Sequence, residues 1–195
     1  MRLALVVLSI ALLIAISAAK AAERPYPHGA FTATFDTEST AAGVGAARHI
    51  SDGQGHLRIE IQQSGNTQIG IVDYLRGVTT AIVPDKQIAV CTPVVPDQCM
   101  AEESVTRDGT PIGTKTIDGH PCHGYQRRQG LFTSDIWIGD DTHYMVHADT
   151  YFQKDKSTFA LRDWSDAPPS PDLFQVPPDY KTINLPPPKG GAPGM

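Results

Sequence analysis

Histidine and cysteine side chains are the groups of this chain whose type and spacing could do chemistry. Among its seven histidines, His120 and His123 flank Cys122, while His143 and His147 follow further along. Such donors bind zinc when four of them converge on one point. On a strand, however, His143 and His147 share a face about 13 Å apart, which is too far for one ion. The first group supplies two ligands at most, so the sequence predicts no metal site.

A nucleophile is the second chemical possibility, and two pairs could supply one: Ser134 with Asp135, and Cys122 with His123. Neither pair lies in the sharp strand-to-helix turn, or in the context of a distant base, that such catalysis uses. Neighbouring residues on a strand point to opposite faces, so Cys122 and His123 are poorly placed to exchange a proton. No glycine-rich loop precedes a helix, which disfavours nucleotide binding. The sequence therefore predicts no catalytic residues and no cofactor.

The N-terminus indicates export from the cytoplasm. Arg2 gives a positive start, residues 3–16 are apolar, and Ala19 and Ala21 stand where signal peptidase cleaves. The apolar stretch is shorter than the roughly 20 residues that cross a bilayer, so we expect no membrane span after cleavage. An uncleaved anchor is the alternative. We predict a signal peptide over residues 1–22 and a periplasmic or secreted bacterial protein.

The expected export affects how the net charge and the cysteines are interpreted. The net charge of −5 becomes −7 once Arg2 and Lys20 leave with the signal, and no Lys/Arg cluster remains, so nucleic acid is not an expected partner. The three cysteines would then lie in an oxidising compartment, where disulfides form. We expect a disulfide between Cys91 and Cys99, because the short proline-containing loop between them already brings its ends together. Cys122 is then a small buried side chain, with other pairings left as alternatives.

Short segments of alternating apolar and polar residues must position these groups. In residues 56–63, Leu57, Ile59 and Ile61 face one side and polar side chains the other. Similar segments, separated by turn residues, are expected as strands over residues 31–35, 43–50, 67–75, 78–83, 87–91, 115–117, 121–128, 131–138, 142–150 and 152–164. Residues 100–107 suit a short helix, and a short helix is also the alternative to a strand for residues 152–164. The sequence predicts a mainly β fold whose antiparallel sheet curls over its apolar side, because a twisted open sheet of this size seldom stays flat.

The domain prediction is a signal peptide, a single antiparallel β domain over residues 23–185, and a disordered tail rich in proline and glycine over residues 186–195. We expect Trp137 and Trp164 to pack as anchors that hold residues 173–180 over an open edge of the sheet, as a plug.

The apolar side of the curved sheet is the candidate ligand site, with Ile69 and Ile71 expected to continue the face of residues 57–61. Either these side chains fill a core, or they line a cavity, since both arrangements have the same alternation. The candidate cavity residues are Leu57, Ile59, Ile61, Ile69, Ile71, Ile136, Ile138, Tyr144 and Val146.

Five segments, taken in order, carry a resemblance to a known family. They are DGQGHLRIE (residues 52–60), IVDY (71–74), IDGHPCHGY (117–125), DIWIGD (135–140) and LFQVPPDY (173–180). The chain resembles an uncharacterised exported bacterial domain family that is related to the lipoprotein-carrier group typified by LolA, LolB and RseB. The resemblance implies a LolA-like half-barrel with few short helices, whose concave side receives acyl chains. The chain lacks the carriers' lid helices and has an odd cysteine, so transport of acylated proteins is not carried over.

Together these observations predict a periplasmic, non-catalytic binding protein that holds a lipid or an acylated peptide in the concave face of a curved sheet. The alternative is an envelope protein-interaction or stress-sensor domain without bound lipid. An enzyme on the same scaffold is the third possibility, and it would need a polar, convergent pocket in place of an aliphatic one.

Overall fold

The computed structural model describes residues 26–93 and 100–186. Its strands are β1 (Ala30–Ser39), β2 (Gly43–Asp52), β3 (His56–Gln63), β4 (Asn66–Asp73), β5 (Val78–Val83), β6 (Ile88–Thr92), β7 (Thr110–Ile117), β8 (His120–Gln129), β9 (Phe132–Gly139), β10 (Met145–Phe152), β11 (Asp155–Ser165) and β12 (Lys181–Asn184). The helical elements are α2 (Glu102–Asp108) and the 3-10 turns η1 (Pro84–Lys86) and η2 (Pro171–Phe174). The expected signal peptide and most of the expected tail lie outside the described residues.

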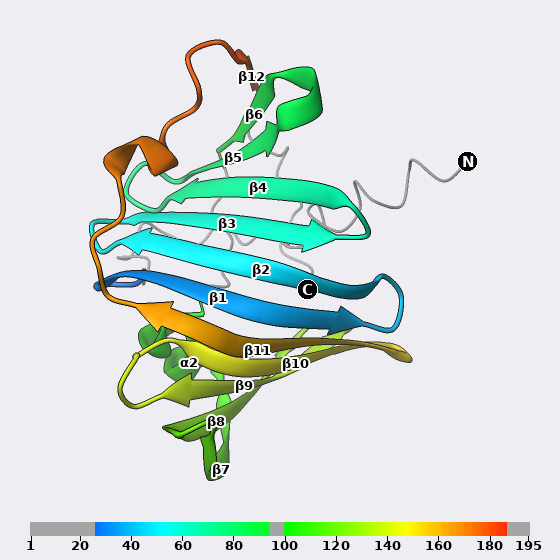
Figure 1. Ribbon diagram of the computed structural model, residues 1–195. Helices are drawn as coiled ribbons and strands as arrows, with labels where there is room; N and C mark the ends of the chain where they lie inside the picture. The colour runs from blue at the N-terminus through cyan, green and yellow to red at the C-terminus, as the bar shows by residue number, and fades with distance from the viewer. Residues whose placement is uncertain (1–25, 94–99, 187–195) are drawn as a thin grey trace, which may run out of the picture.

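All twelve strands form one open sheet in the order β12-β6-β5-β4-β3-β2-β1-β11-β10-β9-β8-β7. Neighbours are antiparallel except for β12, which pairs with β6 in parallel. Figure 1 shows that β8 and β7 turn away behind β9, so the sheet is curved, and that α2 lies behind it. The predicted fold class, a mainly β protein with a curved antiparallel sheet and few short helices, is confirmed.

Two-residue turns connect several neighbouring strands, as the sequence indicates. Ser64 and Gly65 between β3 and β4 have φ angles of 52° and 78°, and Asp118 and Gly119 between β7 and β8 have φ angles of 49° and 90°. Two successive residues at positive φ match the right-handed twist of a hairpin, which explains why a glycine closes each turn.

The main core lies on the face of the sheet that α2 covers, which we call the inner face. Phe31, Phe35 and Leu57 of this face are almost fully buried, and Val105 of α2 packs with them. Phe31 also stacks on Trp164 with ring centroids 4.6 Å apart. In the part of the chain that the structure describes, no helix is long and apolar enough to span a membrane.

The opposite, outer face is also apolar over β4, β5 and β6, where Ile71, Ile82 and Ala89 form a second cluster. Residues 166–185, which we call the C-terminal strap, cover this cluster. Figure 1 shows the strap leaving β11, passing the ends of β1–β3 and reaching β6 as β12. The outer face is therefore polar, as the alternation in residues 56–63 predicts, over only part of the sheet.

The strap is not held as the sequence analysis expected. Phe174, Val176 and Tyr180 pack on the outer cluster, and Arg58 donates to the carbonyl of Leu173 at 3.0 Å. Trp164 belongs to the inner core instead, and Trp137 lies beneath the ammonium of Lys115, 3.9 Å from it. The prediction that the two tryptophans anchor residues 173–180 over an open edge is wrong, because this segment seals a second apolar surface that lies on the other face.

Candidate functional site

The nine candidate cavity residues do not share one face of the sheet. In the β3–β4 register, Leu57 stands opposite Val72, whereas Ile71 stands opposite Arg58 and Ile69 opposite Glu60. Residues that are directly opposite in a pair of strands share a face. Ile69 and Ile71 therefore point outward, beneath the strap, and the prediction that they continue the face of residues 57–61 is wrong.

Of the remaining seven candidates, five fill the inner core. Their exposed fractions are between 1% and 2%, and they are Leu57, Ile136, Ile138, Tyr144 and Val146. Only Ile59 and Ile61 are half-exposed. Inward-pointing side chains thus fill the inner face around Tyr144, and a partly exposed apolar surface lies further along the sheet.

A row of directly paired residues crosses the inner face from the core toward the β6 edge. His49 stands opposite Ile59, Ile59 opposite Gly70, Gly70 opposite Ala81, and Ala81 opposite Val90. A Cβ atom built on Gly70 would have no heavy atom of residues 26–93 or 100–186 within 4 Å, so these residues leave the space above this glycine open. The middle of the row holds the two smallest residues, Gly70 and Ala81, and this leaves room between Ile59 and Val90.

Half-exposed aliphatic side chains surround that open space. We call them the inner patch, and its members are Ile59, Ile61, Gly70, Ala81, Val83 and Val90. Four of them were not among the candidates. The run Ile69–Gly–Ile–Val72 could have indicated these residues. A strand that is apolar at every position is expected to make apolar contacts on both of its faces.

His49 lies at the buried end of this row. Its Nδ1 is 3.1 Å from the hydroxyl oxygen of Tyr144, and its ring contacts those of Phe35 and Phe159. Burial lowers the pKa of His49 from 6.5 to about 4, because the charged ring would lose its water. The side chain is therefore neutral at pH 7.

The histidine and cysteine groups that opened the sequence analysis form separate pairs. His120 and His123 contact Asp141 and Asp140 at 2.7 Å and 2.6 Å, and His143 contacts Glu102 at 2.7 Å. Within residues 26–93 and 100–186, no three potential ligands come together. These contacts are those of surface ion pairs.

The nucleophile candidates form hydrogen bonds with groups that are not bases. Burial raises the pKa of the Cys122 thiol, which donates to the carbonyl of its neighbour His120. Ser134 shares a hydrogen bond of 3.0 Å with Thr150. A thiol with a raised pKa is mostly protonated at pH 7 and is a poor nucleophile.

Cys91 lies on the outer face of β6, with its sulfur 3.4 Å from the hydroxyl oxygen of Thr80. Its expected disulfide partner, Cys99, lies outside the described residues. The pairing of Cys91 with Cys99 stays a prediction.

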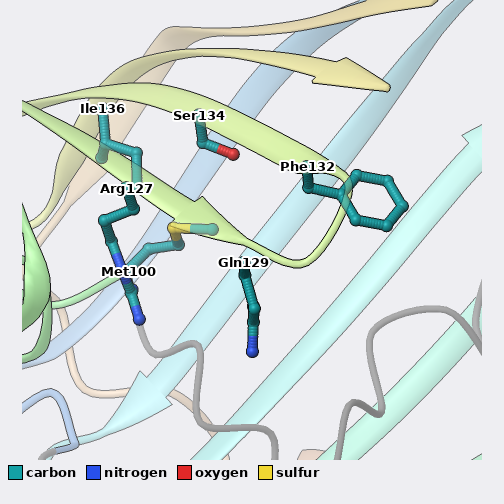
Figure 2. A pocket seen from close by; sticks show the side chains of 6 residues that line it. All are labelled: Met100, Arg127, Gln129, Phe132, Ser134 and Ile136. Carbon is teal, nitrogen blue, oxygen red and sulfur yellow. The ribbon is translucent and has the colours of Figure 1, made fainter. Parts of the chain in front are cut away.

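A second feature of the inner face is a small hollow at β8 and β9 (Figure 2). Its volume is about 20 Å³, and it is lined by Met100, Arg127, Gln129, Phe132, Ser134 and Ile136. Arg127 is the charged side chain among them, with an exposed fraction of 12%. The hollow thus combines apolar walls with a buried guanidinium.

A family match covers most of the described chain. A family of predicted periplasmic proteins, DUF2092, matches residues 62–185, which hold the outer cluster, the strap and most of the inner patch. The chain belongs to the DUF2092 family. The periplasmic location that the N-terminus predicts is thereby confirmed, as is the resemblance to an exported bacterial family. No curated protein matches the chain.

The fold of this DUF2092 member is similar to those of several solved structures. An uncharacterized conserved protein from Thermus thermophilus is similar, with a TM-score of 0.62, 13% identity, and coverage of 81% of this chain and 91% of that one. MucB has a TM-score of 0.50 at 16% identity, and the match covers 83% of this chain and 62% of MucB. The LolA superfamily protein NE2245 from Nitrosomonas europaea has a TM-score of 0.41 at 11% identity, covering 78% of this chain and 93% of that one.

Proposed function

We propose that this periplasmic protein binds an apolar ligand, a lipid or an acylated peptide, on the inner patch of its curved sheet. The main support for this proposal is the difference in exposure between the two faces of β4–β6. The strap buries Ile71, Ile82 and Ala89 on the outer face, whereas the inner patch is half-exposed around the open space at Gly70. Contiguous apolar side chains that stay partly exposed favour a binding site at this position.

A non-catalytic role fits the same residues. The inner patch offers aliphatic contacts and no titratable group, and the paired histidines lie elsewhere on the sheet. An acyl chain needs only dispersion contacts and exclusion of water, each buried methylene contributing about 0.8 kcal/mol. Micromolar binding corresponds to about 8 kcal/mol, so about ten methylenes of an acyl chain would have to be buried on the inner patch.

Replacement of Gly70 by leucine tests the proposal. The new side chain would occupy the open space, so uptake of a fluorescent fatty acid should fall by about 10-fold or more. The thermal midpoint should stay level or rise, because glycine weakens a strand interior and Gly70 has no positive φ.

Thr67→Leu is the matched control, since Thr67 lies on the same strand, is exposed, and pairs with the exposed Gln62. Native mass spectrometry of protein recovered from the periplasm gives a second reading, with bound lipid expected in the wild type only. Equal uptake by wild type and Gly70→Leu, or an equal loss in Thr67→Leu, would contradict the proposal.

Interaction with an envelope protein is the second candidate function, and the β7 edge favours it. Seven of the eight residues of β7 are exposed, and β7 ends the sheet. Such an edge offers backbone donors and acceptors to an added strand. Site-specific crosslinking in cells from Thr114 would capture an envelope protein if β7 is the interface, and no protein if it is not.

A further inference from the structure

The inner face of strands β2–β6, all of which lie within the described residues, carries no Asp, Glu, Lys or Arg side chain. His49, the titratable residue of this face, is buried and neutral at pH 7. The charged residues that follow the inner patch in the chain, Asp85 and Lys86 of η1, are exposed and opposite in sign. The charged side chains of the five strands all stand in rows that point outward, and they are Arg48, Asp52, Arg58, Glu60 and Asp73.

A neutral polar side chain borders the inner patch instead. Gln68 stands directly opposite Ile61 and is two residues from Gly70, on the same face of β4. It is half-exposed, and its amide forms no hydrogen bond in the part of the chain that the structure describes. An amide carries donors and an acceptor at one end, so it can pair with a hydroxyl or with a carbonyl group.

This surface favours an uncharged ligand over an ion. A charged group that lies on it loses part of its water and gains no opposite charge, which costs far more than burying a neutral polar group that keeps a hydrogen bond. The chain as a whole has a net charge of −5, which also repels anions. A fatty acid therefore binds the inner patch with its carboxylate held in water, whereas an uncharged head group can lie against Gln68.

We propose that the ligand of the inner patch is an uncharged amphiphile, such as a fatty alcohol or an acylglycerol. Its hydroxyl or ester group forms a hydrogen bond with the amide of Gln68, and its hydrocarbon chain lies over Gly70 and Ala81 toward Val90. The proposal rests on the function proposed above and narrows the ligand to a neutral lipid.

Three ligands with the same twelve-carbon chain length test the head group: 1-dodecanoylglycerol, dodecanoate and dodecyltrimethylammonium. They are titrated by calorimetry at pH 8, below the concentrations at which they form micelles, into the full chain recovered from the periplasm and freed of bound lipid. In the wild type, the uncharged 1-dodecanoylglycerol should bind about 10-fold or more tightly than either ion. If the acidic chain merely repelled anions, the cation would bind best.

Gln68→Leu and Gln62→Leu form a matched pair of variants. Both replace an amide with an alkyl group of similar size, but Gln62 is exposed on the outer face of β3, opposite Thr67. Gln68→Leu should lose about 3–10-fold in affinity for 1-dodecanoylglycerol, as expected for one neutral hydrogen bond, and should bind both ions at least as tightly as the wild type. Gln62→Leu should keep all three affinities within about 2-fold.

Gln68→Lys adds the charge that the inner face lacks. Because position 68 is half-exposed, the new ammonium group reaches water and the strand can keep its place. The affinity for dodecanoate should rise by about 5-fold or more over the wild type, whereas Gln62→Lys, with the same charge on the outer face, should change it by about 2-fold or less. A gain in binding also shows that the Gln68→Lys protein is folded.

Other outcomes overturn the proposal in distinguishable ways. A wild type that binds dodecanoate or the cation as tightly as 1-dodecanoylglycerol has no preference for uncharged head groups, but its apolar site remains. A Gln68→Leu protein with the wild-type affinity for 1-dodecanoylglycerol, or equal effects at positions 62 and 68, removes the contact to Gln68. Failure of the wild type to bind any of the three ligands contradicts the proposed function itself.

Discussion

A chain that ends after Asp166 is expected to lose about 3–6 kcal/mol of unfolding free energy. Its missing strap covers Ile71 and Ile82, each only 5% exposed, and fully exposing one such side chain costs about 1.5–3 kcal/mol. The truncation also removes β12 and with it the parallel pairing to β6. Urea unfolding, followed by tryptophan fluorescence, measures the loss, and a dye that binds apolar surface should bind the truncated protein.

Leu185→Ala provides the control for this prediction. Leu185 is part of the strap but is 45% exposed, so its truncation should change the free energy by about 0.5 kcal/mol or less. A truncated chain with the urea midpoint of wild type would show that the outer cluster does not need the strap.

Acidification from pH 6.5 to pH 4 should lower the free energy of unfolding by about 3 kcal/mol through the titration of His49 alone. The unfolded chain protonates this residue as the pH falls through 6.5, whereas the pKa of the buried ring is about 4. Over that window the unfolded state binds more protons, so stability falls as the pH falls, and each unit of pKa difference is worth about 1.4 kcal/mol.

His49→Gln isolates this contribution, because glutamine also forms hydrogen bonds with the Tyr144 hydroxyl but does not titrate. Urea unfolding of both proteins between pH 8 and pH 4 is the measurement. At pH 8 their difference reports only packing, and the wild type should lose about 3 kcal/mol relative to that baseline as the pH reaches 4. Parallel curves for the two proteins would contradict the buried, neutral His49.

The carboxylates titrate in a different range. Hydrogen bonds and nearby cations lower the pKa values of Asp52, Asp108 and Asp149, despite the opposing effect of partial burial. Their stabilising effect is complete above the ordinary carboxyl pKa and is lost as the pH falls through the lowered values. It remains in both proteins of the comparison, so it cancels between wild type and His49→Gln.

Local sequence determined the strands and turns of this protein. The alternation of Leu57, Ile59 and Ile61 predicts β3 with its observed bounds, and the residues around Gly65 and Gly119 predict the turns that follow β3 and β7. These features depend on near neighbours in the chain, because alternation and positive φ are properties of a few consecutive residues. The N-terminal pattern predicted the periplasmic location in the same way.

Only the tertiary structure decided which apolar residues share a face and which remain exposed. Ile69 and Ile71 alternate as Ile59 and Ile61 do, but the β3–β4 register turns them to the opposite side. The strap comes from about 100 residues further along the chain, and no local pattern places it over Ile71 rather than over Ile59. Because a one-residue change of register reverses every side chain of a strand, the inner patch and the Arg127 hollow follow from pairing and coverage, which are long-range contacts.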